Sequence, residues 1–244
     1  MYSDYINPPL DGFKGKLLDD YLGAGYYRMR HDLFTTHSIP RFDGENSLIF
    51  MPVFWLRTLV NKITENKSAI RIRKQCAAFT VEYTSAAITE EIEELYTIYH
   101  SKIEFEAAER CRDYLEDPLK PNPFDSRMIA IRDGRKLIAV GYFDVGEEAM
   151  MGILNFYHPD YRKYSLGKYL MLKKIDFAKQ NGIQYYYTGY LGTTETKFDY
   201  KLFPDKKAME VLLAFDQQWV PWGKYDKGWL HGYFMDQVLG TANS

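Results

Sequence analysis

The strongest place for chemistry is the start of a predicted helix at Ser165, which is followed by Leu166 and Gly167. Backbone N–H groups in the first turn of a helix lack partners within it, so they attract anions and carbonyl oxygens. A β-rich run at 153–157 leads into this point, and a second run at 183–187 follows the helix. The sequence therefore predicts a strand–helix–strand unit that binds an anion or a carbonyl group at the helix start.

The helix itself is predicted from the apolar residues between 166 and 178, which recur on a helical period. Ser165 is a suitable N-cap, and the pair Asn181-Gly182 suits a left-handed C-terminal cap. Pro159 stops the preceding strand before the helix begins. We therefore expect one amphipathic helix between Ser165 and Asn181.

A mostly β segment precedes this unit. We expect a short helix at 16–22, followed by strands at 26–37, 48–54 and 79–83. Between the last two strands lies a basic cluster with few acids, made of Lys62, Lys67, Arg71, Arg73 and Lys74. Such a cluster is either a solvated face or a contact for the phosphates of a nucleic acid.

The order of the remaining elements predicts the fold. Two helices are expected at 89–101 and 105–115, with Thr89 as the first cap. An antiparallel meander follows, with strands at 126–132, 136–145 and 149–157. Together with the strand–helix–strand unit, this is the order of the GNAT-type N-acetyltransferase fold. We therefore expect an α+β protein whose mixed central sheet is flanked by helices.

Two parts are expected in the chain: a small, mostly β N-terminal subdomain at 1–84 and the GNAT-like domain at 85–244, which ends in one more strand and a helix at 225–239. Of the 244 residues, 46% are hydrophobic and 26% are charged, and the formal net charge is −2. These values are typical of a globular protein and do not indicate a general nucleic-acid binder.

Cys76 and Cys111 form neither a CxxC pair nor a metal-ligand spacing, so no metal site is predicted. The longest apolar run, at 48–56, is interrupted by Pro52 and is too short to span a bilayer. With no signal peptide, these features predict a cytoplasmic protein that does not enter membranes. The oligomeric state stays open.

Acetyltransferases of this fold bind the CoA pyrophosphate with the pattern R/Q-x-x-G-x-G/A at the helix start. Here Arg162 and Gly167 match that pattern, but Ser165 replaces the first glycine, so the backbone cradle is incomplete. CoA-dependent N-acyl transfer is therefore kept as an alternative function, in which CoA would be the co-substrate.

Five segments favour another family. They are Gly134–Val145, Asn155–Tyr161, Ser165–Tyr169, Tyr186–Tyr190 and Lys197–Lys201. Their residues, order and spacing resemble the aminoacyl-tRNA–protein transferases, the arginyl- and leucyl-transferases that act on the N-terminal residues of proteins. The family patterns are G-x-L-I-A-V-G-x-x-D, Y-D-P-D-Y, S-L-G-x-Y, Y-x-x-G-Y and K-M-x-Y-K. The resemblance covers about residues 90 to 205.

Upstream, Gly25-Tyr-Tyr-Arg28 is similar to the G-F-R-R step of the family, and Lys67-Ser-x-x-Arg71-x-x-Lys74 to its basic R-S-x-x-R-x-x-R segment. The N-terminal cysteine cluster of the family has no counterpart, because Thr36, His37 and Ser38 stand where it would fall. No metal, iron–sulfur or haem role is therefore carried over. A binding protein that kept the fold but lost activity with its cysteines is a third hypothesis.

The resemblance implies transfer of an amino acid from aminoacyl-tRNA to the α-amino group of a protein that begins with Asp or Glu, which marks that protein as an N-degron for degradation. Arginine is the expected amino acid and leucine is the alternative. The expected partners are aminoacyl-tRNA, as co-substrate, and protein substrates with acidic N-termini; no further cofactor is implied. The reaction is aminolysis of an ester, in which the positioning of a neutral amine dominates.

The resemblance also implies site residues. The predicted catalytic residues are Asp144, Tyr157, Asp160 and Tyr190. The predicted substrate-binding residues are Ser165, Leu166, Gly167, Lys197, Tyr200 and Lys201. The predicted tRNA-binding residues are Lys67, Arg71, Arg73 and Lys74.

Each of these groups has a structural alternative. Asp144 either orients the acceptor amine or caps a strand end, and Asp160 is of a type that commonly follows proline in a turn. The two tyrosines either line a pocket or pack in the core. Lys197 and Lys201 either grip tRNA phosphate or an acidic N-terminal side chain, or they form a solvated face. His158 is either structural or catalytic.

Overall fold

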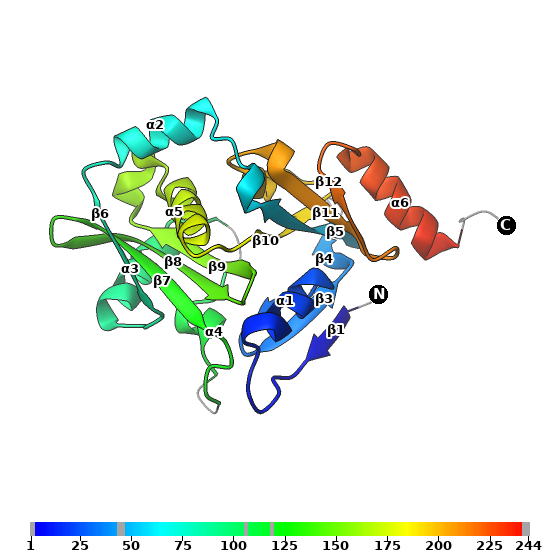
Figure 1. The fold of residues 1–244 in the computed structure, drawn as a ribbon, viewed down its shortest axis with the longest axis horizontal. Coiled ribbons are helices and arrows are strands. Elements are labelled where there is room, and N and C mark those ends of the chain that lie inside the picture. The colour runs from blue at the N-terminus through cyan, green and yellow to red at the C-terminus, as the bar shows by residue number, and fades with distance from the viewer. Residues whose placement is uncertain (1–2, 43–46, 105–106, 118–119, 241–244) are drawn as a thin grey trace.

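The computed structural model describes residues 3–42, 47–104, 107–117 and 120–240. Within these residues, the centre of the molecule is a mixed sheet of nine strands with helices on both faces (Figure 1). The strand order along the sheet is β12-β11-β5-β10-β9-β8-β7-β6, and β4 pairs with β5. The chain therefore has the α+β class that its sequence predicts.

One half of the sheet has the predicted GNAT-type order. It contains β6 (Thr80–Ser85), α3 (Glu90–His100), α4 (Arg112–Leu115), β7 (Ser126–Asp133), β8 (Lys136–Val145), β9 (Ala149–Tyr157), α5 (Leu166–Gln180) and β10 (Tyr185–Gly192). Strands β6 to β9 are antiparallel neighbours. In contrast, β10 pairs in parallel with β9, because α5 carries the chain back across one face of the sheet. This arrangement confirms the predicted fold.

The central strand β8 is buried on both faces. Ile138 and Phe143 belong to the apolar cluster under α5, whereas Val140 and Tyr142 belong to the cluster under α3. A strand covered on both faces needs apolar side chains in both directions, which explains the unbroken run from Leu137 to Phe143. The core of this half is thus built around β8.

The other half of the sheet combines an early and a late segment of the chain. It contains β4 (Ser38–Phe42), β5 (Leu48–Leu59), β11 (Met209–Leu213) and β12 (Gln218–Pro221), and α6 (Lys227–Leu239) packs against it. Because β5 pairs antiparallel with β10, both halves form one sheet. The tail thus forms two strands rather than the predicted one, followed by the predicted helix. The division of the chain at residue 84 stays a prediction.

Two further layers pack on these elements (Figure 1). The first contains α1 (Gly15–Gly23) and a small sheet of β1 (Ser3–Ile6), β3 (Asp32–Thr36) and β2 (Tyr27–Met29). Leu18 and Leu22 of α1 share an apolar cluster with Met151 of β9 and Tyr187 of β10. The second layer is α2 (Lys67–Gln75), which packs on α5.

Three local predictions are wrong. The segment 26–37 is two strands rather than one, joined at Arg30, where φ is 57°. The helix expected at 105–115 is only the single turn of α4; residues 105 and 106 lie outside the described residues. Ser165 holds the cap position of α5 but its side chain makes no capping hydrogen bond, and its backbone is left-handed (φ 54°) instead of the extended conformation of an ordinary cap.

Candidate functional site

Strands β9 and β10 separate part-way along their length. They pair over three positions, and the pair of Tyr187 with Met151 is the last. Beyond it, β9 continues beside β8, whereas β10 continues beside β5. We call the region between Gly152–Tyr157 and Thr188–Gly192 the strand split. Because strands that part cannot satisfy each other's backbone groups, other groups must pair with them there.

Tyr27 of β2 occupies the strand split from the N-terminal layer. Its hydroxyl lies within hydrogen-bonding distance of the carbonyl oxygens of Gly152 on β9 and Tyr187 on β10, at 3.3 Å from the latter. Its ring stacks on that of Trp55, with centroids 5.3 Å apart. Burial raises the pKa of Tyr27 well above its usual value, so the hydroxyl stays a donor. Tyr27 thus ties the two strands together where they part.

Lys201 reaches the strand split from the segment after β10. Its Nζ donates a hydrogen bond to the carbonyl oxygen of Tyr190 at 2.9 Å and lies 4.6 Å from the centroid of the Phe198 ring. Gly189 permits this approach, because its φ is 96° and a Cβ there would lie 2.9 Å from Lys201 Nζ. Burial, together with the charge of Lys197, lowers the pKa of Lys201 to about 7. A large fraction of Lys201 is therefore neutral near neutral pH.

The start of α5 lies beside the strand split. A Cβ on Gly167 would lie 3.6 Å from the Tyr157 ring, so the ring lies beside this glycine and leaves just enough room for a Cβ. Leu166 is fully buried and anchors the first turn in the core. Because the side chain of Ser165 makes no capping hydrogen bond, the first-turn N–H groups can attract an anion or a carbonyl oxygen. Three predicted substrate-binding residues therefore lie next to the predicted catalytic Tyr157.

The predicted catalytic tyrosines pack against neighbours and also lie at the strand split. Tyr190 meets Trp55 edge to face, with centroids 5.4 Å apart, and Tyr157 packs against Tyr99 at 5.9 Å. Two buried donors nearby, the Trp55 Nε1–H and the Thr188 hydroxyl, make no hydrogen bond to any described residue. The split is thus an aromatic environment with unused hydrogen-bond donors.

Lys197 and Tyr200, which come before and after Phe198 in the chain, lie at the surface. Lys197 Nζ is 5.6 Å from the centroid of the Phe198 ring, and Tyr200 is 51% exposed. Lys197 is exposed, unlike Lys201. The two lysines that are four residues apart in the predicted motif therefore have different surroundings.

Asp144 lies at the end of β8 in a buried ion pair. It is fully buried, and it accepts hydrogen bonds from Arg28 Nη1 at 2.8 and 2.9 Å and from the Ser126 hydroxyl. Burial raises the pKa of Asp144, and Arg28 opposes that rise. These contacts favour the structural alternative, and a catalytic role for Asp144 stays a prediction.

Asp160 and His158 lie at the 3-10 helix Pro159–Tyr164 between β9 and α5. The Asp160 side chain is 79% exposed, and its backbone N–H donates to His158 Nδ1 at 3.3 Å. The ring of His158 packs against Tyr161. Asp160 thus lies in a turn after Pro159 and His158 packs structurally, as their non-catalytic alternatives predict. None of these contacts involves a residue of the strand split.

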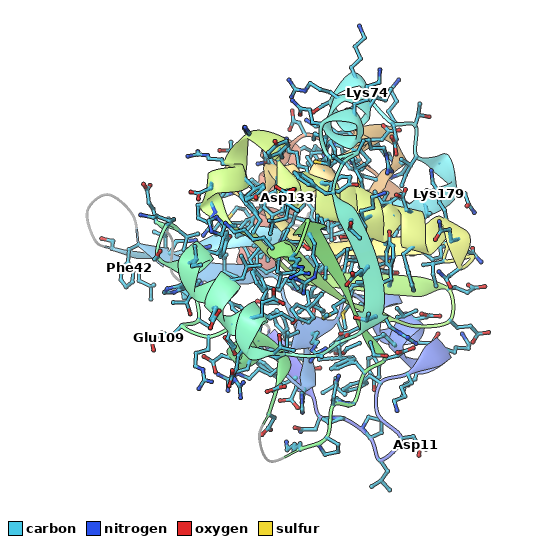
Figure 2. The ribbon with its side chains drawn as sticks, turned by 90° about the vertical axis from the view of Figure 1, so that its left-hand side faces the viewer. Asp11, Phe42, Lys74, Glu109, Asp133 and Lys179 are labelled. Carbon is cyan, nitrogen blue, oxygen red and sulfur yellow. The ribbon has the colours of Figure 1, made fainter. Side chains whose placement is uncertain are left out.

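The predicted tRNA-binding residues lie on α2. Arg73 is held by Glu65 at 2.5 Å and by Asp176 of α5 at 2.7 Å, so it anchors α2 to α5. The remaining basic residues line a hollow of about 390 Å³, together with Ile70 and Gln75; they are Lys67, Arg71 and Lys74. Lys74 lies at the outer edge of the molecule (Figure 2). Lys67, Arg71 and Lys74 are thus the predicted tRNA-binding residues that are exposed at the surface.

Both ends of α2 contact segments of the candidate site. At its C-terminal end, Cys76 Sγ lies 3.5 Å from the carbonyl oxygen of Tyr164, the residue before Ser165. At its N-terminal end, the Asn66 side chain donates to the carbonyl oxygen of Pro204, three residues after Lys201. The basic helix therefore runs between the two segments that approach the strand split.

A second hollow, of about 370 Å³, lies where β9 and β10 begin, at the opposite end from the strand split. Its polar groups are paired within the protein: Arg57 binds Glu210 at 2.7 Å, and Asp19 accepts a hydrogen bond from the N–H of Glu148 at 2.8 Å. None of the predicted site residues lines it.

The side chains that could serve metal or thiol chemistry in the described part of the chain are those of His, Cys, Asp and Glu. No group of three or more His, Cys, Asp or Glu side chains there could hold a metal ion. Cys76 and Cys111 are buried, and burial raises their pKa values to about 11 and about 12. Thiols with such pKa values stay protonated at neutral pH, which makes them poor nucleophiles.

Among the described helices, none is both long and apolar enough to cross a membrane.

Sequence reasoning alone does not assign a site role to Tyr27, Arg28 or Trp55. Tyr27 and Arg28 lie in the segment 25–28, and the resemblance of that segment to a family step is the only available signal. Trp55 lies in an apolar run with no motif. Their positions depend on how the N-terminal layer docks on the sheet, which no local pattern specifies.

Comparison with known proteins agrees with the motif resemblance. The family model described as "Arginine-tRNA-protein transferase, C terminus" matches residues 91–207. An aspartate/glutamate leucyltransferase from Teredinibacter turnerae is 30% identical over 172 residues, which cover 68% of each chain. One from Ruegeria pomeroyi is 31% identical over 146 residues, covering 58% of this chain and 54% of that protein. An arginyl-tRNA–protein transferase from Arabidopsis thaliana is 28% identical over 209 residues, covering 75% and 32%.

The fold places the protein among GNAT-type α+β proteins, and the matched residues run from α3 to the segment after Lys201. The chain belongs to the family of aminoacyl-tRNA–protein transferases, which includes leucyl- and arginyl-transferases. It spans between about one third and two thirds of the length of the three relatives named above.

Proposed function

We propose that the protein transfers an amino acid from aminoacyl-tRNA to the α-amino group of proteins that begin with Asp or Glu. Membership of the family supports this reaction class, since the relatives are named as leucyl- and arginyl-transferases. The structural observation that carries the proposal is the position of the family segments at the strand split, where the Tyr157 ring lies beside Gly167 and Lys201 contacts Tyr190. Aminoacyl-tRNA is the co-substrate, and the proposal requires no further cofactor.

The reaction needs two substrates in one place. The amine nitrogen of the acceptor attacks the ester carbonyl of the aminoacyl-tRNA, so a C–N bond forms and the C–O bond to the ribose breaks. The amine loses a proton, and the departing ribose oxygen gains one. The uncapped N–H groups at Gly167 suit the carbonyl oxygen, because negative charge develops on it as the amine attacks. Positioning of the two substrates supplies most of the remaining acceleration.

The basic surface of α2 suits the tRNA. Lys67, Arg71 and Lys74 carry positive charge at the surface, and the two ends of their helix contact Tyr164 and Pro204 beside the site. Cations on this path would neutralise backbone phosphates while the ester end of the tRNA reaches the strand split.

Leucine is the amino acid that the surroundings favour. The side chains around the split are largely aromatic, and two carboxylates of the segment after β10 already have partners: Glu195 pairs with Arg41 and Asp199 with Lys227. An arginine side chain would require an available carboxylate, whereas a leucine side chain requires only apolar contact. Lys197, exposed beside Phe198, is the candidate to bind the acidic side chain of the acceptor.

The test is a transfer assay with purified protein, tRNA charged with radiolabelled leucine or arginine, and peptides that begin with Asp, Glu or Ala. We expect label on the Asp and Glu peptides, with leucine preferred, and none on the Ala peptide. Absence of transfer from both tRNAs would contradict the proposal. Transfer of arginine only would contradict the choice of leucine.

A CoA-dependent N-acyltransferase is the second candidate, because one observation favours it. Ser165 has the left-handed conformation (φ 54°) that a glycine would readily adopt, so the loop before α5 keeps a backbone that a phosphate cradle could use. The same assay with acetyl-CoA in place of tRNA tests this candidate. Acylation of the peptide by acetyl-CoA, without transfer from tRNA, would support it over the first.

A further inference from the structure

The surroundings of Lys201 are unusual for a charged lysine. Its Nζ makes one hydrogen bond, to the carbonyl oxygen of Tyr190, and lies over the rings of Tyr190 at 4.8 Å and Phe198 at 4.6 Å. No described carboxylate lies within ion-pair distance of it. A surface lysine normally keeps its ammonium in water, whereas this one holds its amine against aromatic rings.

The position of the Lys201 amine is specified by the backbone. Gly189 has a φ of 96°, and the site of its missing Cβ is 2.9 Å from Lys201 Nζ and 3.9 Å from the ring carbon that bears the Tyr27 hydroxyl. A side chain at position 189 would therefore displace the amine. The amine lies where β9 and β10 part. It is close to the Tyr27 hydroxyl, which bridges the backbones of the two strands there.

The ionisable groups that face the amine come from three elements. They are Tyr27 of β2, Tyr190 of β10 and Lys197 of the same segment as Lys201. The two tyrosines are neutral, because burial raises their pKa values, and Lys197 disfavours a second positive charge. The pKa of Lys201 is lowered to about 7 for these reasons.

Given the transfer reaction proposed above, on which this inference rests, we propose that Lys201 is its general base. As the C–N bond forms, the proton on the acceptor nitrogen passes to the lone pair of the neutral Lys201 amine. As the C–O bond breaks, the departing ribose oxygen takes that proton from the Lys201 ammonium. The lysine returns to its neutral form, so each cycle balances without any other co-reactant.

This role differs from an electrostatic contact with a phosphate or with the acidic side chain of the acceptor. Such a contact needs a permanent positive charge, and arginine would provide it as well as lysine. A general base must be neutral before the reaction, and arginine stays protonated at any assay pH. The two roles therefore predict opposite results for the same conservative substitution.

The kinetic test compares Lys201→Met, Lys201→Arg and the exposed control Lys224→Met with wild type in the transfer assay. We expect both Lys201 variants to lose about 100-fold or more in kcat, with KM for the acceptor changed less than about threefold. The control should stay within about twofold of wild type. Full activity in Lys201→Arg, or a change confined to KM, would overturn the proposal.

The pH profile adds a readout that a structural role would not change. In wild type, both the acceptor amine and Lys201 must be neutral, so log kcat/KM should rise with a limiting slope of about 2 below pH 6.5. In Lys201→Met only the acceptor amine titrates, and the slope should fall to about 1. An unchanged slope would contradict the assignment.

A measurement without turnover separates this inference from the proposed function. NMR titration of protein with ¹³C-labelled lysine should show a signal with a midpoint near pH 7 that is missing from Lys201→Met. A midpoint above about 9 would overturn the inference even if wild type transfers amino acids. If wild type transfers nothing, the proposed reaction fails, and a midpoint near 7 would still confirm the neutral amine. Thermal unfolding of each variant checks that a lost activity is not lost folding.

Discussion

Two lysines with the same lowered pKa, about 7, lie in different regions of the molecule. Lys174 is fully buried under α5, where its Nζ donates to the carbonyl oxygen of Tyr142 at 2.7 Å. Lys201 lies at the strand split, only partly buried, beside Gly189 and Tyr190. Burial is the first cause of the lowered pKa in both cases.

The difference between these regions is access. A neutral amine sealed in the core can only change the free energy of unfolding, because no substrate reaches it. A neutral amine that a substrate can reach can exchange protons with it. A lowered pKa therefore does not identify a functional lysine until its surroundings are known. Four variants test the wider distinction between buried groups that stabilise the fold and groups that a substrate can reach.

The strongest disturbance is expected from Arg28→Met, because it leaves the fully buried Asp144 without its ion-pair partner. We expect the free energy of unfolding to fall by about 3 to 5 kcal/mol at pH 7, measured by urea denaturation. As a control, Arg30→Met at the nearby exposed position should change the free energy of unfolding by less than about 0.5 kcal/mol. A loss below about 1 kcal/mol in Arg28→Met would mean that the pair is not the structural anchor between β2 and β8.

Lys174→Met should increase stability, because it removes a buried amine that is destabilising when protonated. The folded pKa is about 7 and the unfolded value about 10.5, so the unfolded state binds more protons between these values and stability rises with pH across that window. We expect a gain of about 2 to 4 kcal/mol at pH 7, after loss of the hydrogen bond to Tyr142, that fades towards pH 10.5. Denaturation at pH 7 and pH 10 measures it, with Lys179→Met as the exposed control. Equal effects at both pH values would contradict the buried neutral amine.

Arg71→Glu combined with Lys74→Glu should weaken tRNA binding about tenfold to a hundredfold, because two phosphate contacts become repulsive. Filter binding at several salt concentrations measures it, and the salt dependence should also become shallower. The double variant Arg135→Glu/Lys224→Glu has the same change of charge at two exposed positions away from α2 and should bind within about threefold of wild type. Equal weakening in both double variants would mean that net charge, and not the surface of α2, governs binding.

Ser165→Gly should have the smallest effect. The left-handed backbone at this position costs a residue with a Cβ more than it costs glycine, so the variant should be more stable by about 0.5 to 1 kcal/mol. Thermal unfolding measures it. Destabilisation instead would mean that the serine side chain makes a contact that stabilises the start of α5.

The fold was largely predictable because its signals are local. The apolar period of α5, the turns of the meander and the cap at Thr89 each follow from a few neighbouring residues, and the structure agrees with them. The site was predictable only as a set of motif residues. The neutral state of Lys201 depends on Tyr190, Phe198 and the backbone of Gly189, and the bridge made by Tyr27 depends on the docking of a distant layer. The buried pair of Asp144 likewise follows from tertiary packing, whereas the exposed turn at Asp160 follows from the local sequence after Pro159.

The proposed reaction site is the strand split, and its lysine is proposed to be neutral and within reach of a substrate. Competitive labelling with an amine-reactive reagent at pH 7.5, followed by mass spectrometry and transfer assays, tests this directly. We expect Lys201 to be modified before the ordinary exposed lysines, Lys174 to stay unmodified in the folded protein, and transfer activity to fall in proportion to the modification of Lys201. Labelling of Lys201 as slow as that of Lys174, or full labelling of Lys201 without loss of transfer, would contradict a reachable neutral amine at the reaction site.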